Sequence, residues 1–139
     1  MIDLLTTARS LRPLVEAEAD VTDGELTMTA PVVEAIAASG LNHLQVPKDL
    51  GGLEADVDTT LDVLEEVAHQ DGSIGWAYMA NANATAMCSM LDPELAREML
   101  DGRPEVVCAG QFVSRGKARR VEGGFEVHGR FQFGSGINQ

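Results

Sequence analysis

The last third of the chain, residues 106–136, constrains the fold most, because it is patterned for antiparallel strands. Val106–Phe112 is a short apolar run of residues that favour strands. Glu122-Gly123-Gly124 predicts a tight turn, since glycine adopts positive φ without steric cost. Beyond the turn, apolar and polar residues alternate over residues 125–133, which is typical of a half-buried strand. We therefore expect the beginning of an antiparallel sheet here.

The residues before this region are patterned for helices. Apolar residues recur at near-helical spacing over residues 2–20, where Pro13 marks a kink or a fresh start. Thr22-Asp23-Gly24 predicts a break after this helix. A second helix is expected to begin after Thr29, as its cap, and to end at Gly40.

A loop and two longer helices follow. Pro47 and the pair Gly51-Gly52 place residues 41–56 in a loop. The next helix begins after Asp56, and its expected buried stripe consists of Val57, Leu61, Leu64 and Ala68. The helix over residues 74–90 is apolar or small on almost every side, a pattern that favours complete burial.

A last helix and a boundary complete the prediction. Asp92-Pro93 opens a short helix, because proline suits the first helical turn. Gly102-Arg103-Pro104 then separates the helices from the strands. The predicted fold class is α+β, with an all-helical block over residues 1–103 and the first strands of an antiparallel β domain over residues 104–139. Because the carboxyl end falls inside the expected sheet, we expect the chain to be an amino-terminal fragment.

The charge is distributed unevenly between these two parts. The net charge is −12, yet residues 1–102 hold nineteen acidic and four basic side chains, while residues 103–139 hold three acidic and six basic ones. An acidic helical surface argues against binding to nucleic acid or to an anionic membrane. No apolar run reaches the roughly 20 residues that a membrane span needs, and Asp3 interrupts the amino end, so no signal peptide is expected. Cys88 and Cys108 lie far apart in the sequence, and two free thiols indicate a reducing cytoplasm.

The sequence lacks independent catalytic or metal-binding motifs. No Gly-x-Gly-x-x-Gly follows a strand, and no phosphate-binding loop ends in Gly-Lys-Ser/Thr. The three histidines, which lack the spacing of metal ligands, are His43, His69 and His128. Glu65-Glu66 admits a general-acid interpretation, but we expect these residues to form the solvated face of an amphipathic helix. Ser135 has no adjacent base, so a nucleophilic role is unsupported, and no catalytic acid or base is assigned.

Two segments carry a resemblance to a known family. One is residues 121–136, Val-Glu-Gly-Gly-Phe-Glu-Val-His-Gly-Arg-Phe-Gln-Phe-Gly-Ser-Gly, and the other is residues 40–76, with Pro47-x-x-x-Gly51-Gly52 and Asp71-Gly72-Ser73 before Gly75-Trp76. Both resemble the acyl-CoA dehydrogenase superfamily, and most closely its branch of two-component flavin-dependent monooxygenases, which hydroxylate aromatic substrates. That branch usually has tryptophan at the position of Phe131. The resemblance covers nearly the whole chain, and it implies that residues 104–139 begin a β-barrel-like middle domain.

The resemblance also implies a flavin site. Main-chain groups at the end of the first strand are expected to bond the edge of the isoalloxazine ring, and by position these belong to Gln111, Phe112 and Val113. An aromatic residue followed two positions later by serine is expected close to flavin N5, and Phe133 and Ser135 match it. Simple roles in the strand core and in a turn are the alternative for these two residues.

A substrate pocket is implied near the start of the helix over residues 74–90. Trp76 is expected to wall a pocket for an aromatic substrate, with simple packing at a helix start as the alternative. The basic cluster consists of Arg115, Lys117, Arg119 and Arg120. It is either a solvated hairpin edge that discourages sheet aggregation or an attraction for the phosphate of a flavin or of coenzyme A.

One departure separates the branches of the superfamily. Acyl-CoA dehydrogenases proper carry Thr-Glu-Pro-x-x-Gly-Ser-Asp after the first strand, whereas residues 111–118 retain only the glycine. This favours a monooxygenase that hydroxylates an aromatic or polyketide substrate. An FAD-dependent acyl-CoA dehydrogenase is the second hypothesis, and a non-catalytic oligomerisation or binding module is the third.

The resemblance further implies cofactors and partners. We expect reduced FMN or FAD, delivered by a flavin reductase, together with oxygen and a small aromatic substrate, or an acyl-CoA under the second hypothesis. A homo-oligomer, either a dimer or a tetramer, is expected as well. The catalytic base of the family lies in a carboxyl-terminal helical bundle outside these residues.

Overall fold

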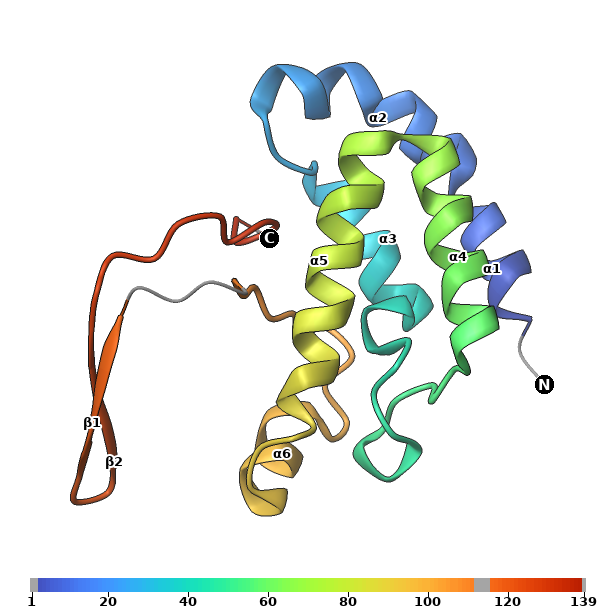
Figure 1. The fold of residues 1–139 in the computed structure, drawn as a ribbon. Coiled ribbons are helices and arrows are strands. Elements are labelled where there is room, and N and C mark those ends of the chain that lie inside the picture. The colour runs from blue at the N-terminus through green and yellow to red at the C-terminus, as the bar shows by residue number, and fades with distance from the viewer. Residues whose placement is uncertain (1–2, 112–115, 139) are drawn as a thin grey trace.

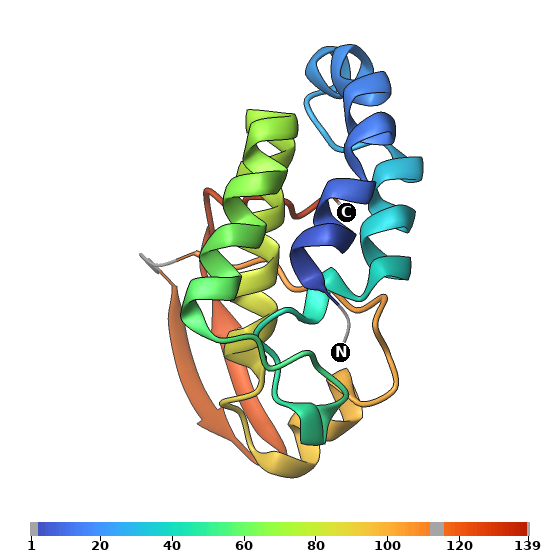
Figure 2. The ribbon, with the colours of Figure 1, turned by 90° about the vertical axis from the view of Figure 1, so that its right-hand side faces the viewer.

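A computed structural model describes residues 3–111 and 116–138, which form a helical block and one β-hairpin (Figure 1). The helices are α1 (Leu4–Ser10), α2 (Arg12–Glu25), α3 (Ala30–Ser39), α4 (Val57–Gln70), α5 (Gly72–Cys88) and α6 (Pro93–Leu100), with the short 3-10 helices η1 (Leu41–His43) and η2 (Lys48–Leu50). The strands are β1 (Lys117–Val121) and β2 (Gly124–His128). The hairpin lies on the α5 side of the molecule, and α1 lies on the far side (Figures 1 and 2). The predicted order of helices followed by antiparallel strands is confirmed.

The centre of the helical block is the antiparallel pair α4 and α5. Asp71 joins the two helices, and its carboxylate accepts a 2.8 Å hydrogen bond from the N–H of Ile74, which caps α5. Gly75 allows the pair to approach closely, because a Cβ there would lie 2.5 Å from Cα of Ala68. The main core around this pair consists of Ala8, Leu11, Val15, Val32, Ile36, Leu41, Leu44, Val63, Val67, Ile74, Tyr78 and Ala82.

The first helices follow the sequence prediction with one exception. Helix α3 begins after Thr29 and ends at Gly40, whose φ of 76° is the left-handed conformation expected of a terminating glycine. The predicted break at Thr22-Asp23-Gly24 is wrong, since α2 continues to Glu25. Thr22 is buried against the block, and the helix ends only where Leu26 adopts a φ of 57°. Tertiary packing therefore outweighs the local break signal.

The predicted buried stripe of α4 is wrong for Val57, Leu61 and Ala68, and only Leu64 of the four packs against the core. Val57 and Leu61 are 71% and 59% exposed, whereas Val63 and Val67 are buried. The apolar residues of α4 cover more of its circumference than one stripe, and the helix turns the Val63 side toward α1 and α5. Helix α5 likewise buries one face only, and its other face leaves Trp76 and Met87 exposed.

The hairpin has the predicted turn but fewer strand residues than predicted. β1 and β2 pair antiparallel with Lys117 opposite His128, and Gly123 turns the chain with a φ of 81°. The strand expected at Val106–Phe112 is wrong for its described part, because residues 106–111 contain no strand. Their backbone groups bond to side chains of the helical block instead of to a neighbouring strand. Residues 129–134 also lie outside the sheet.

Candidate functional site

A cleft of about 360 Å³ lies between the α2–α3 connection, the start of α5 and the carboxyl-terminal segment. Its walls combine apolar and polar side chains without a cluster of charge. The residues that line it are Thr22, Asp23, Leu26, Thr27, Met28, Ser73, Trp76, Ala77, Gly134, Ser135, Gly136, Ile137 and Asn138. A mostly neutral, partly apolar cleft of this kind suits a flat organic ligand better than a nucleic acid or a metal ion.

Two residues predicted from the sequence meet in this cleft. Nε1 of Trp76 donates a 3.2 Å hydrogen bond to Oγ of Ser135, although the two residues lie 59 positions apart. Trp76 is 64% exposed, so most of its ring remains available to a ligand. The contact between Gly75 and Ala68 fixes the rotation of α5 and thereby directs Trp76 away from the core. The structure thus joins the expected substrate residue and one expected flavin residue.

A buried asparagine that the sequence analysis did not single out holds the cleft together. Nδ2 of Asn81 donates to the carbonyl of Cys108 at 3.0 Å and to the carbonyl of Gly136 at 3.3 Å. Gly136 has a φ of 70°, and a Cβ there would lie close to the amide of Asn81. One side chain of α5 therefore positions both carboxyl-terminal segments. The available signal was a pair of asparagines in an otherwise apolar helix, because a polar group is retained in such a helix when it has a partner.

Of the other residues predicted to bind the flavin, the structure describes Gln111 and Phe133. Oε1 of Gln111 accepts a 3.1 Å hydrogen bond from the N–H of Gln132, so the two predicted segments lie side by side at this point. Nε2 of Gln111 is buried and has no partner within the described residues. Phe133 does not line the cleft; it is 89% exposed with a φ of 62°. Phe112 and Val113 lie outside the described residues.

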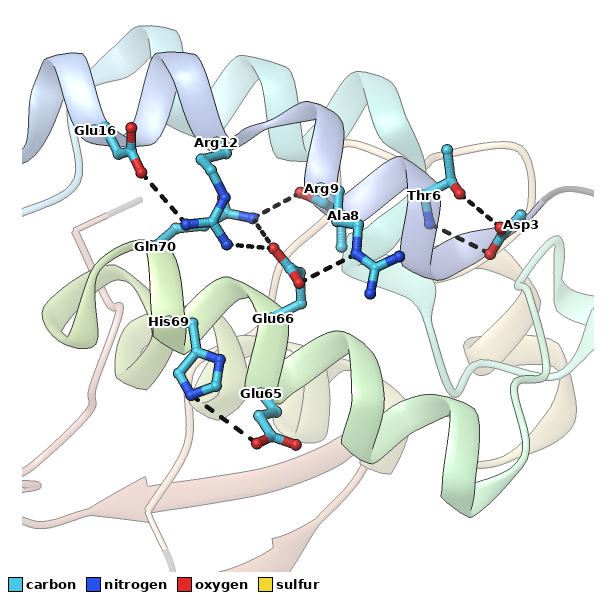
Figure 3. A network of polar contacts seen from close by, with 10 residues as sticks. All are labelled: Asp3, Thr6, Ala8, Arg9, Arg12, Glu16, Glu65, Glu66, His69 and Gln70. Atoms are coloured by element: carbon cyan, nitrogen blue, oxygen red, sulfur yellow. Dashed lines mark hydrogen bonds and ion pairs between the residues drawn. The ribbon is translucent and has the colours of Figure 1, made fainter.

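The pair Glu65-Glu66 is divided between two environments (Figure 3). The Glu66 carboxylate accepts hydrogen bonds from Arg12 at 2.7 Å and from Gln70 at 3.2 Å, and it pairs with Arg9 at 3.4 Å. The hydrogen bond from Arg12 is the main cause that lowers the pKa of Glu66 below its ordinary value. With a side chain only 12% exposed, Glu66 is a brace between α4 and the first two helices rather than a solvated residue, whereas Glu65 is on the surface. Neither residue lines the cleft, so the general-acid interpretation gains no support here.

Two further features are absent from residues 3–111 and 116–138. No group of three or more histidine, cysteine or acidic side chains in these ranges is arranged to hold a metal ion. Among the helices of the same ranges, none is long and apolar enough to cross a bilayer.

Residues 6–100 match the family model described as "Acyl-CoA dehydrogenase, N-terminal domain". This match includes most of the chain and all of its helical core, so the chain belongs to the family of acyl-CoA dehydrogenase N-terminal domains. The family resemblance expected from the sequence is therefore confirmed.

Within this family, the chain is similar to monooxygenases and hydroxylases. It is 31% identical to an indole-3-acetate monooxygenase of Pseudomonas putida over 114 residues, which are 82% of this chain and 29% of that protein. It is 23% identical to a pigment production hydroxylase of a Rhodococcus strain over 134 residues, which are 96% of this chain and 35% of that protein. The chain thus spans about a third of the length of these relatives.

Solved structures show the same fold. The 3-HSA hydroxylase of Rhodococcus sp. RHA1 superposes with a TM-score of 0.90 at 19% identity, over 99% of this chain and 35% of that one. XiaF from Streptomyces sp., solved in complex with FADH2 and glycerol, superposes with a TM-score of 0.82 at 24% identity, over 91% of this chain and 32% of that one.

Proposed function

We propose that this chain is part of a flavin-dependent monooxygenase that hydroxylates an aromatic or polyketide substrate with reduced flavin and oxygen. The observation that carries the proposal is the Trp76–Ser135 hydrogen bond across the cleft, in a chain whose relatives are monooxygenases and hydroxylases. The absence of the Thr-Glu-Pro-x-x-Gly-Ser-Asp run supports the monooxygenase over the acyl-CoA dehydrogenase.

The proposed flavin contact at Ser135 follows from its hydrogen bonding. A hydroxyl group can accept one hydrogen bond and donate another at the same time. The hydroxyl group of Ser135 accepts a hydrogen bond from the indole N–H of Trp76. Within the described residues no acceptor takes the Ser135 proton, so that proton is available to a nitrogen or oxygen on the polar edge of a flavin. The hydrogen bond from the indole also polarises the hydroxyl group of Ser135, which strengthens the hydrogen bond that this group donates. Asn81 maintains this arrangement by fixing the carbonyl of the following residue, Gly136.

The proposal assigns the substrate and the flavin to different residues. The exposed ring of Trp76 offers a flat surface on which an aromatic substrate stacks. Gln111, Phe112 and Val113 supply main-chain groups to the flavin edge, and the Gln111–Gln132 hydrogen bond supports this role by joining the two segments. Phe133 covers the ring from outside the cleft. The reduced flavin, FMN or FAD, supplies the two electrons that activate oxygen; these residues orient it and limit the access of water.

The proposal extends to partners and location. A flavin reductase supplies the reduced flavin, and the protein works in the cytoplasm as a homo-oligomer, either a dimer or a tetramer. Exposed apolar side chains on α5, on the hairpin and on the segment that follows it support further contacts with protein; these are Trp76, Met87, Phe125, Val127, Phe131 and Phe133.

The fluorescence of Trp76 tests the flavin site directly, because it is the single tryptophan of the chain. Titration with reduced FMN and with reduced FAD under anaerobic conditions is expected to quench the emission of Trp76. Ser135→Ala removes one hydrogen bond to the ligand and is expected to weaken the affinity about tenfold. Ser73→Ala is the matched control, because Ser73 lines the same cleft but has no hydrogen bond to Trp76, and its affinity should equal that of the unmodified protein.

The same titration separates the three hypotheses. Quenching by neither flavin would contradict the proposal and favour the binding module. Bleaching of bound oxidised FAD by an acyl-CoA would favour the dehydrogenase. Binding of reduced flavin followed by oxygen transfer to a phenol or an indole, measured as hydroxylated product, would support the monooxygenase.

A further inference from the structure

The two cysteines are neighbours in space, although 20 positions separate them in the sequence. Their Sγ atoms lie 3.2 Å apart, and both thiols are free and half-buried. Cys88 is the last residue of α5, and Cys108 lies on the segment that leads from α6 toward Gln111. Their large separation in sequence therefore gave no indication of this contact.

The contact is built by the backbone of Cys108. Its N–H donates to Oγ1 of Thr85 at 3.0 Å, and its carbonyl accepts from Nδ2 of Asn81 at 3.0 Å. Because residues 81, 85 and 88 lie on one face of α5, the two hydrogen bonds direct the side chain of Cys108 toward Cys88. The ring of His43 adds a 3.1 Å hydrogen bond to the carbonyl of Val106 and fixes the same segment from the other side.

We propose that Cys88 and Cys108 form a reversible disulfide when a peroxide is present. One thiol gives up its proton as its sulfur attacks an oxygen of hydrogen peroxide; the O–O bond breaks, the proton joins the leaving hydroxide to form water, and the sulfur becomes a sulfenic acid. The second sulfur displaces the hydroxyl group of the sulfenic acid as a second water. The two thiols lose two electrons in total, and hydrogen peroxide gains them. The sulfur atoms must approach from 3.2 Å to about 2.05 Å, a movement that side-chain rotation at two half-buried residues can supply.

The disulfide would fix one end of the candidate flavin segment to the helical block. In the reduced form, hydrogen bonds with the side chains of Asn81, Thr85 and His43 hold residues 106–108, and such bonds open and close locally. A covalent bond between Cys88 and Cys108 removes this opening. Burial raises the pKa of the Cys88 thiol to about 11, so Cys88 is protonated at neutral pH and the pair stays reduced until an oxidant is supplied. The disulfide forms or fails to form whether or not the protein binds flavin.

Mass spectrometry after peroxide treatment tests the proposal. The reduced protein, freed of reductant, is exposed to hydrogen peroxide and should lose the mass of two hydrogen atoms. A peptide that joins Cys88 to Cys108 should appear in a non-reducing digest and vanish with dithiothreitol. The midpoint of thermal unfolding should rise by about 5 °C or more on oxidation, because the bond closes a loop of 20 residues.

A register control keeps the test specific. The double variant Cys88→Ser with Ser89→Cys retains two cysteines but moves one thiol about 100° around the helix. It should form no intramolecular disulfide under the same treatment, and far-UV circular dichroism checks that it is folded. Addition of oxygen atoms without a joined peptide in the unmodified protein would overturn the proposal, as would a disulfide in the register control at an equal rate. A joined peptide with no rise in the unfolding midpoint would overturn the stabilising role.

Discussion

The helical block and the carboxyl-terminal region are held in place by different forces. Residues 3–100 enclose an apolar core to which α1 to α5 all contribute. Residues 106–111 and 116–138 contribute no residue to that core, although Val106 packs against a smaller cluster made by Val46, Leu50, Ala96 and Leu100. They attach to the block mainly through hydrogen bonds with the side chains of His43, Asn81 and Thr85. Burial therefore stabilises the helical block globally, whereas the position of the candidate flavin segment depends on individual hydrogen bonds.

The largest expected effect comes from the core of the helical block. Leu41→Ala removes a side chain with no solvent exposure and should lower the free energy of unfolding by about 3 kcal/mol. Leu61→Ala makes the same chemical change on the exposed face of α4 and should change it by less than about 0.5 kcal/mol. Denaturant unfolding followed by circular dichroism measures both. Equal losses would mean that the face of α4 carrying Leu61 is buried after all.

A second, local effect is expected at the connection between the two regions. Asn81→Ala leaves the carbonyls of Cys108 and Gly136 without their donor and should cost about 2 kcal/mol. The lost hydrogen bonds attach the carboxyl-terminal segments to the helical block. Amide hydrogen exchange should therefore accelerate more in residues 106–111 and 134–138 than in the helical core. Asn83→Ala is the matched control, since Asn83 lies two positions away on another face of α5 and has no hydrogen bond to these segments. Uniform acceleration over the whole chain would contradict a local attachment.

A third effect depends on pH and lies within the helical block. The hydrogen bond from Arg12 lowers the pKa of Glu66 in the folded state, so ionised Glu66 stabilises the fold above its ordinary pKa, and this contribution is lost as the pH falls through the lowered value. Glu66→Gln should therefore reduce the thermal midpoint modestly at pH 7, and the difference from the unmodified protein should close as the pH falls through the lowered pKa of Glu66. Glu65→Gln, on the exposed neighbour, should change the midpoint little at any pH. A deficit of Glu66→Gln that persists unchanged at low pH would exclude the ion pair as its cause.

The helical block was largely predictable because its signals are local. Caps at Asp56, Asp71 and Asp92 and the glycine at Gly40 mark helix ends through bonds made within a few residues. The face of α4 was not predictable, since its apolar residues cover a wider arc than its buried stripe, and the positions of α1 and α5 decide which of them are buried. The continuation of α2 past Gly24 has the same cause, because it depends on the burial of Thr22.

Residues of the candidate site were predictable only where they belong to a sequence pattern of the family. Trp76 and Ser135 could be named from the resemblance, and the structure then joined them. The partners of Asn81 and the Cys88–Cys108 contact were not predictable, because each joins residues at least 20 positions apart and neither belongs to a quoted motif. Val106–Phe112 was assigned to a strand from its composition, but a strand needs a neighbour, and residues 106–111 bond to helix side chains instead.

A substitution in the hairpin is expected to have the smallest effect on global stability, because the hairpin contributes least to the helical core. Gly123→Ala places a side chain at a φ of 81° and should cost roughly 1 kcal/mol within the β1–β2 turn. Since the hairpin adds nothing to the helical core, its amides should exchange faster while the thermal midpoint of the helices remains unchanged. Gly24→Ala, within α2 and with open space around its Cβ, should instead raise that midpoint, because alanine favours the helix by up to about 1 kcal/mol. If Gly123→Ala lowered the thermal midpoint of the helices as well, the hairpin would be coupled to the core. The attachment through Asn81 would then unfold together with the helical block and not as a separate local unit.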